Sequence, residues 1–251
     1  MKRLLLLAGL LMPILLSAQS KDPKKDKSTV IALRALPNET ENLEKGLAQH
    51  VKNFHSADGK IDVYEVLTGT HTGEYRFVYR TPASWADVET AFTAANDKSH
   101  ADDWTENVAK YTDGKNNRSF YEISDDSYLP SDPTAMQAPL MGVYIITIKP
   151  GMEEDFYAGI KRIKEMYKKA KSKNYYIIQS QAFGLGSQAV VIFPLPNGFA
   201  SLEPNPNDDW SKMFKAAFPK EDYKAWSKKF GGTQQAFESF VVKRRADLSS
   251  Q

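Results

Sequence analysis

The feature that most constrains the fold of this chain is an internal repeat. Residues 30–80 align without a gap on residues 143–193, a constant offset of 113 (143 − 30). A repeat is the first thing to establish in a sequence, because each copy then predicts the fold of the other. The aligned identities include Val30 with Val143, Pro37 with Pro150, Glu41 with Glu154, Gly46 with Gly159, Lys60 with Lys173, Gly73 with Gly186, and Val78 with Val191.

Each copy predicts the same order of elements. The first copy has a strand at residues 30–36, a helix at 39–55 and strands at 61–68 and 74–80. The second copy has a strand at residues 143–149, a helix at 153–171 and strands at 175–181 and 188–193. A glycine-bearing turn joins each hairpin. Trp85 and Trp210 then begin matched helical segments, Trp104 matches Trp226, and strands at 118–124 and 236–243 close the copies. The order β-α-β-β-α-β, with the second helix split, predicts an α+β protein of two ferredoxin-like repeats.

The first residues predict export. Lys2 and Arg3 precede an apolar run at residues 4–16, and small residues follow it at Ser17, Ala18 and Ser20, as in a secretory signal peptide. The run is short for a membrane span, so an uncleaved anchor is the lesser alternative. We therefore expect a periplasmic or secreted protein. The expected division is signal peptide 1–20, disordered spacer 21–28, repeats 29–124 and 141–245 with linker 125–140 between them, and C-terminal tail 246–251.

Composition excludes several classes of chemistry. The chain has no cysteine, which rules out thiol catalysis, cysteine-based zinc sites and disulfides. Its net charge is +2, with basic and acidic residues mixed along the chain, which argues against nucleic acid as a partner. No later segment is apolar enough for a membrane span in the mature chain. The sequence does not predict an oligomeric state.

Period-two alternation divides each sheet into two faces. The face expected to pack against the helices carries Ile31, Leu33, Ala35, Tyr75, Phe77 and Tyr79 in the first copy, and Tyr144, Ile146, Ile148, Val190 and Ile192 in the second. The opposite face carries Arg34, Glu65, Arg76, Arg80 and Glu122, with Val30, Ala32, Val63 and Val78 between them, in the first copy. In the second it carries Thr147, Ile178, Ala189, Phe193 and Val241.

An apolar sheet face of this size needs a cover, and two sheets from one chain can cover each other. In its element order, the proline after each first strand and the Trp-bearing helix after each third strand, residues 30–243 resemble the dimeric α+β barrel superfamily. That group includes antibiotic-biosynthesis monooxygenase-like and EthD-like domains. The resemblance implies two ferredoxin-like units packed sheet to sheet as a pseudo-dimeric barrel around a cavity.

The charged residues of the first copy are the candidate ligand site. Arginine gives bidentate contacts to anions, so this face could bind a small polar or anionic ligand. The alternative is that these residues form cross-strand pairs at a half-solvated sheet, and that the tryptophans pack in the core. The candidate ligand-binding residues are Arg34, Glu65, Arg76, Arg80, Glu122 and Trp85.

Recognisable catalytic motifs are absent from the sequence. There is no nucleophile elbow, zinc-protease motif, phosphate loop or dinucleotide fingerprint. His50 and His55 are five residues apart, which is not one helix face, so we expect no metal site and no cofactor. His100 lies among aspartates that are expected to cap a helix, and His71 lies in a hairpin turn. Haem-degrading members of the superfamily use an asparagine on the first strand, and no asparagine occurs at residues 30–36.

These observations favour an exported protein that binds a small molecule or a partner without catalysis, in a cavity between the two sheets. A cofactor-independent oxygenase is the alternative that the resemblance implies. A structural envelope protein without a ligand is the third. Because the first copy keeps charges where the second has apolar residues, we expect any ligand site to lie in the first.

Overall fold

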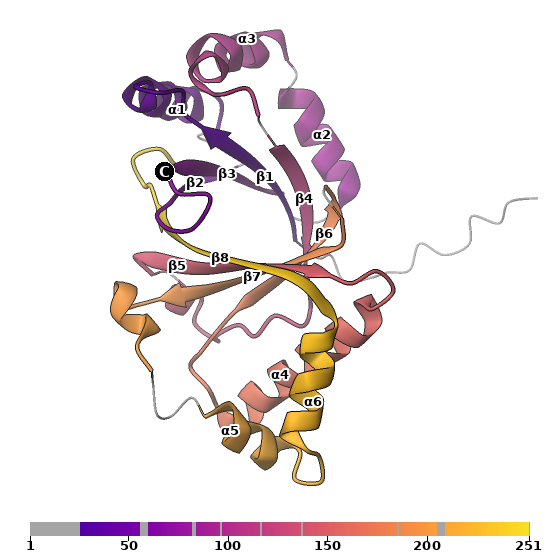
Figure 1. Ribbon diagram of the computed structural model, residues 1–251. Coiled ribbons are helices and arrows are strands. Elements are labelled where there is room, and N and C mark those ends of the chain that lie inside the picture. Colours follow the sequence, from indigo (N-terminus) through magenta and orange to yellow (C-terminus); the bar gives the residue numbers. More distant parts are fainter. Residues whose placement is uncertain are drawn as a thin grey trace, which may run out of the picture.

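Eight antiparallel strands close into one barrel, with helices on two opposite sides of it (Figure 1). The computed structural model describes residues 26–55, 60–81, 84–95, 97–115, 117–136, 138–184, 186–204 and 209–250. The strands are β1 Lys27–Arg34, β2 Ile61–Val66, β3 Glu74–Thr81, β4 Asn117–Ile123, β5 Leu140–Ile148, β6 Ile177–Phe183, β7 Gln188–Leu195 and β8 Gln234–Arg244. The helices are α1 Thr40–Phe54, α2 Trp85–Ala95, α3 Lys98–Asn107, α4 Glu153–Ala170, α5 Trp210–Ala217 and α6 Tyr223–Gly232. Three short 3₁₀ turns are η1 Ala109–Tyr111, η2 Pro133–Met136 and η3 Gly198–Leu202.

The two halves of the chain contribute equal parts of the barrel. Going round it, the strands follow the order β4-β1-β3-β2 and then β8-β5-β7-β6, and β6 pairs with β4 to close the ring. Helices α1, α2 and α3 lie outside the strands of the first half, and α4, α5 and α6 lie outside those of the second (Figure 1). The α+β class and the closed barrel expected from the sequence are therefore confirmed.

The first helix of each half is amphipathic and packs on its own sheet. In α1 the buried positions are Leu43, Gly46, Leu47, His50 and Val51, a spacing that places them on one helix face. Their apolar members join Leu33, Tyr75 and Phe77 in the core of the first half. The matching core of the second half contains Phe156, Ile160, Ile163 and Met166 of α4.

Two glycines let the helices approach each other closely. A side chain at Gly46 would collide with the backbone carbonyl of Asn107, at the end of α3. A side chain at Gly159 would collide with the ring of Phe230 in α6. The close approach of α1 to α3 in the first half brings His50 and His100 together, as described below.

The predicted faces are right for β1, β3 and β5 and wrong elsewhere. Val63 packs on the helix side of β2, whereas Tyr64 lines the barrel interior. Tyr121 and Ile123 of β4 line the interior, and Glu122 between them does not. In the second half, Ile178, Ala189 and Phe193 pack with the helices, and Val190 and Ile192 lie inside the barrel.

Strand register explains the error in β7. Val30 pairs with Val78 in the first half, whereas Val143 pairs with Ile192 in the second. The offset of 113 thus becomes 114 at the third strand (192 − 78), and a slip of one residue moves every side chain of a strand to the other face. At the second strand Asp62 lies opposite Val78 and Ile177 opposite Ile192, an offset of 115 (177 − 62). A slip of two keeps the face, so Ile178 shares the error made for Val63 and Glu65 in β2.

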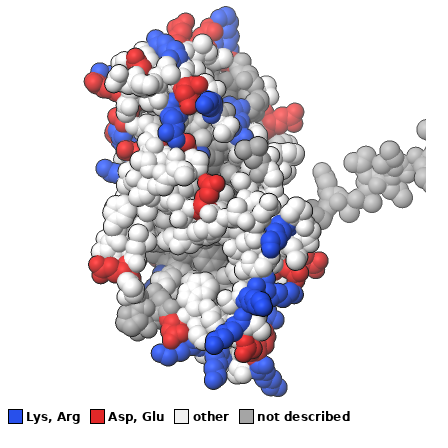
Figure 2. All heavy atoms as spheres, viewed as in Figure 1, with Lys and Arg blue, Asp and Glu red and all other residues white. Residues whose placement is uncertain are grey.

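Charged side chains gather over the helices at both ends of the face shown in Figure 2, and the barrel between them is mostly uncharged there. Both signs are mixed at each end, so this face carries no patch of a single sign. Among the described residues, no helix is long and apolar enough to cross a membrane. The expected signal peptide lies outside the described residues.

Candidate functional site

The barrel encloses a cavity of about 860 Å³ between the two half-sheets. Most of its wall is apolar and comes from inward-facing residues such as Val30, Val143 and Val190. Arg76 is the predicted site residue that lines it. Its guanidinium lies over the ring of Phe240, 5.6 Å from the centroid, and one Nη donates to Glu74 at 2.8 Å. Its Nε is buried and has no hydrogen-bond partner among the described residues.

Burial lowers the pKa of Arg76, and the carboxylate of Glu74 opposes that shift. Arg34 also donates to Glu74, at 2.8 Å, so one carboxylate holds both arginines. These contacts, with hydrogen bonds from His71, outweigh burial and lower the pKa of Glu74. The structure therefore brings Arg34 and Arg76 together at one end of the barrel.

The other predicted site residues lie apart from this pair. Glu65 faces the helix side, where Arg245 lies 3.3 Å away. Glu122 pairs with the buried Lys27 at 2.6 Å. Trp85 begins α2, is 37% exposed and contacts Phe183. It lines neither the barrel cavity nor the second cavity, which is described next. The backbone of Arg80 lies in β3 opposite Ser28, and its side chain lies outside the described part of the structure.

A second cavity, of about 640 Å³, lies between the sheet and the helices of the first half. We call it the helix-side cavity. Aromatic and aliphatic side chains make much of its wall, with Arg118 and several small polar residues beside them. The wall includes Ile31, Phe54, Ile61, Phe77, Tyr79, Val88 and Trp104.

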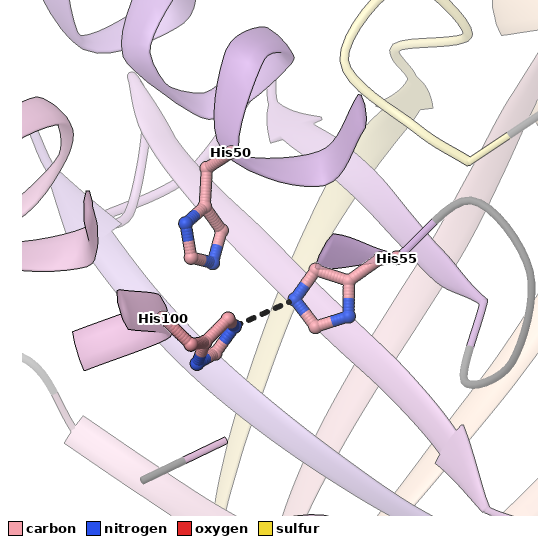
Figure 3. Close-up of side chains that lie close together, drawn as sticks. All are labelled: His50, His55 and His100. Carbon is pink, nitrogen blue, oxygen red and sulfur yellow. Dashed lines mark hydrogen bonds between the residues drawn. The ribbon is translucent and has the colours of Figure 1, made fainter. Parts of the chain in front are cut away.

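Three of the four histidines of the chain meet at the wall of the helix-side cavity (Figure 3). His50 comes from α1, His55 from the residue that ends that helix, and His100 from the first turn of α3. One ring nitrogen of each lies within 4.8 Å of the corresponding nitrogens of the other two. The Nε2 atoms of His55 and His100 are 3.3 Å apart and share a hydrogen bond.

His50 is the buried member of the cluster. Its Nδ1 lies 2.7 Å from a carboxylate oxygen of Asp103, and Asn107 donates to the other oxygen of that carboxylate at 2.9 Å. Its Nε2 is buried without a hydrogen-bond partner in the described chain. Burial lowers the pKa of His50, and the hydrogen bond to Asp103 opposes the shift only in part. The ring is therefore neutral near pH 7, with a lone pair available for a ligand.

The spacing argument in the sequence did not reveal this cluster, because it treated His50 and His55 as positions on one helix. His55 is the C-cap residue, with φ −130° and ψ 23°, so the chain has left the helical path there. His100 reaches the cluster only through the packing of α3 on α1. One signal was available in the sequence: all four histidines fall in the first copy. Asp97 caps α3 as expected, accepting from the backbone N–H of Ser99.

The corresponding layer of the second half is filled with stacked rings. Phe214 stacks on Trp226 at 4.7 Å, Trp226 on Phe230 at 5.6 Å, and Phe230 on Phe156 at 5.5 Å. Under the offset of the first helices, Ile163 stands where His50 stands in the first half. The two halves thus use the same layer differently.

Known structures of the same fold span almost the whole chain. An anthrone oxidase-like protein matches with a TM-score of 0.58 and 9% identity over 90% of this chain and 92% of that one. A proposed monooxygenase from Lactobacillus acidophilus matches with a TM-score of 0.53 and 12% identity, over 91% and 97%. A chlorite dismutase variant from Candidatus Nitrospira defluvii matches with a TM-score of 0.52 and 9% identity, over 89% and 92%.

The likeness is one of fold. At these identities it supports the barrel architecture that the resemblance to the dimeric α+β barrel superfamily implied, and it assigns no activity. No protein-family model matches the sequence, and neither does any curated protein. Function must therefore be argued from the two cavities and their side chains.

Proposed function

We propose that the helix-side cavity of the first half binds a small aromatic molecule. The observation that carries this proposal is the convergence of four aromatic side chains, Phe54, Phe77, Tyr79 and Trp104, with a group of imidazoles on one cavity of about 640 Å³. Ligand sites typically combine an apolar wall with a few convergent polar groups. Flat rings provide a surface on which another flat ring can stack.

Arg118 adds a cationic group to this wall. Arg118 is an exposed residue overall, and the protein packed near its guanidinium lowers its pKa. A guanidinium in such a place favours a ligand that carries an oxygen acceptor, such as a phenol or an aromatic carboxylate. The class of ligand that we propose is therefore a small oxygenated aromatic compound.

The enzyme alternative is oxidation of that molecule by dioxygen. Structures with this fold include an anthrone oxidase-like protein and proposed monooxygenases, which makes this the reaction class to test first. This alternative rests only on similarity of fold, so binding without catalysis remains the leading proposal.

The barrel interior is a second candidate ligand site. Its cavity lies between the two sheets, where the sequence led us to expect one, and the Nε of Arg76 is buried with no hydrogen-bond partner in the described part of the chain. A buried donor left without an acceptor costs free energy, about 1–3 kcal/mol. An amphipathic molecule with an acceptor head group would satisfy that donor and fill the apolar space. This version retains the proposal of non-catalytic binding.

One experiment separates the two cavities. Ala101 of α3 lines only the helix-side cavity, so Ala101→Trp should fill it, whereas Arg76→Ala changes the barrel interior. Quenching of tryptophan fluorescence by a panel of phenols, naphthols, anthrones and aromatic acids would report binding. We expect Ala101→Trp to weaken binding at least about tenfold, equivalent to about 1.4 kcal/mol, and Arg76→Ala to leave it unchanged. The reverse pattern would reject the helix-side cavity in favour of the barrel interior.

Turnover needs its own measurement. Each panel member that binds would be incubated with the protein in air and under nitrogen, with products followed by mass spectrometry. Oxygen-dependent product formation that is lost in Ala101→Trp supports the oxygenase alternative. Binding without turnover supports the non-catalytic proposal, and no binding at either cavity favours a structural envelope protein.

Export and internal duplication complete the proposal. We expect the mature chain to begin near residue 19 or 21, which intact-mass analysis of the exported protein would show. We also propose that the two halves are tandem ferredoxin-like copies. Their shared element order and the shared strand order within the barrel support this.

A further inference from the structure

We propose that His50, His55 and His100 bind one divalent transition-metal ion at the wall of the helix-side cavity. The proposal deepens the function proposed for that cavity, because a bound metal would give an oxygenated aromatic ligand a position to coordinate. It does not depend on the identity of that ligand, and it can be tested without it.

The spacing of the ring nitrogens suits a single ion. Two imidazole nitrogens bound to one zinc-like ion, each at about 2.1 Å and at a tetrahedral angle, lie roughly 3.4 Å apart. The Nε2 atoms of His55 and His100 are 3.3 Å apart. The nitrogens of all three rings lie within 4.8 Å of one another, so small changes in side-chain torsion bring the third into range.

The hydrogen bond between His55 and His100 is also informative. It joins two Nε2 atoms, so one ring must supply a proton that both nitrogens face. A metal ion between the rings takes the lone pairs of both Nε2 atoms, so the ring that carries this proton either moves it to its own Nδ1 by way of water, if the ring is neutral, or releases it to solvent, if the ring is an imidazolium. Binding of a metal to neutral imidazoles in place of protons is the usual coupling between metal affinity and pH.

His50 has the surroundings of a metal ligand. Histidines that bind metals commonly donate their other N–H to a carboxylate, which fixes the tautomer and aims the free nitrogen. Asp103 occupies that position at Nδ1, and Asn107 in turn holds Asp103. Among the described residues the buried Nε2 of His50 has no hydrogen-bond partner, a costly arrangement that a metal would relieve.

A purely structural role accounts for the cluster less well. The three rings do pack among aromatic neighbours, and His50 contacts Trp104 edge to face at 5.0 Å. Packing alone would be served better by an apolar side chain, as at Ile163 in the second half. Three imidazoles that face one another stabilise a core less than apolar side chains do. Their nitrogens, one of which has no hydrogen-bond partner among the described residues, are well suited to bind a metal ion.

The donor set also selects the class of metal. Imidazole nitrogens suit zinc, copper, nickel, cobalt and iron(II), whereas calcium and magnesium require oxygen ligands. Three protein ligands leave at least one coordination position open, as in catalytic zinc sites. That position faces the helix-side cavity, since the same histidines line its wall.

The test uses protein purified without a polyhistidine tag, stripped with a chelator and titrated separately with Zn²⁺, Co²⁺ and Cu²⁺ by calorimetry. Cobalt also reports its ligand field by visible absorption. We expect one equivalent of at least one of these ions to bind. His55→Ala and His100→Ala, which alter partly exposed residues, should each weaken binding by more than the roughly 10- to 100-fold that outer-shell changes cost. His50→Gln tests the buried ligand.

Two controls make the result decisive. His71 is the fourth histidine and lies in the β2–β3 hairpin near Glu74 and Glu238, so His71→Ala should bind metal like the wild type. Asp103→Asn should weaken binding by about 10- to 100-fold while keeping its stoichiometry, because it acts through His50. Circular dichroism checks that each variant is folded.

Failure of this proposal can be told apart from failure of the aromatic-ligand proposal. Absence of stoichiometric binding by all three ions would overturn the metal site, as would binding that survives in folded His55→Ala and His100→Ala variants. If metal binds as expected and no aromatic compound does, the metal site stands and the proposed ligand class is wrong.

Discussion

The helix layers of the two halves differ, although the strands beneath them are arranged alike. In the second half, the rings of Phe156, Phe214, Trp226 and Phe230 stack in a continuous row between the helices. In the first half the same layer contains a cavity and three histidines. The difference shows that one half of the barrel is built for stability, while the other carries polar groups that stability alone does not require.

The largest expected effect of substitution lies in the filled half. Phe156 is fully buried against Phe230 and Tyr157. Phe156→Ala should lower the free energy of unfolding by about 3–5 kcal/mol, because it removes a large apolar group and leaves a cavity in packed surroundings. Urea denaturation followed by far-ultraviolet circular dichroism would measure this. A loss below about 1 kcal/mol would show that the layer is not tightly packed.

A smaller loss of stability is expected when the histidine found at position 50 of the first half is placed at the matching position of the second half. Ile163→His places an imidazole among the apolar side chains that form the core of the second half. It should lower the free energy of unfolding by about 2–4 kcal/mol, through lost apolar burial and an unsatisfied polar group. A change within experimental error would mean that both layers tolerate histidine equally, and the comparison would fail.

The reverse exchange should have little effect on stability. His50→Ile removes the orphan Nε2 but also takes a partner from Asp103, which keeps its hydrogen bond from Asn107. We expect the free energy of unfolding of the metal-free protein to change by less than about 1 kcal/mol. Metal binding should be lost. A large destabilisation would instead assign His50 a structural role.

The smallest expected effect is a change of stability with pH, because it comes from the titration of one side chain, His50. Burial lowers the pKa of His50 from its ordinary value of 6.5, with a smaller contribution from His100, and Asp103 opposes the shift. The unfolded chain therefore takes up a proton before the folded protein does. Stability from this group is complete above about pH 6.5 and decreases as the pH falls toward the folded pKa.

The comparison of wild type with His50→Ile tests that group. His50 interacts with Asp103 and His100, so the difference between the two proteins includes these two couplings. When the pH is lowered from about 7.5 to about 5.5, the urea midpoint of unfolding should fall more for the wild type than for His50→Ile. Equal changes in the two proteins would show that His50 does not titrate as described.

The sequence predicts the barrel well because the barrel depends on patterns that repeat. The helix faces of α1 and α4, the hairpin turns and the alternation in β1, β3 and β5 follow from local spacing of apolar residues. The face of β7 was wrong because the register shifts there by one residue, and the face of β6 was wrong because it was copied from a wrong face of β2. Alternation in those strands is weak, since Val190, Val191 and Ile192 are all apolar.

The site was harder to predict, because its members meet only through tertiary packing. His55 turns back at a helix end, and His100 depends on the approach of α3 to α1 at Gly46. Neither event leaves a spacing rule in the sequence. The charged residues that the sequence analysis selected do not form one site in the fold. Arg34 and Arg76 both pair with Glu74, whereas Glu65 lies on the opposite face of the sheet.

The most direct test of this account is a crystal structure of the protein soaked in zinc or cobalt, with an anomalous difference map at the metal edge. The account predicts one strong peak between the rings of His50, His55 and His100, with Asp103 still bound to His50. It also predicts no peak in the ring stack of the second half. A map with no peak at the three histidines, or with its only strong peak at His71, would contradict it.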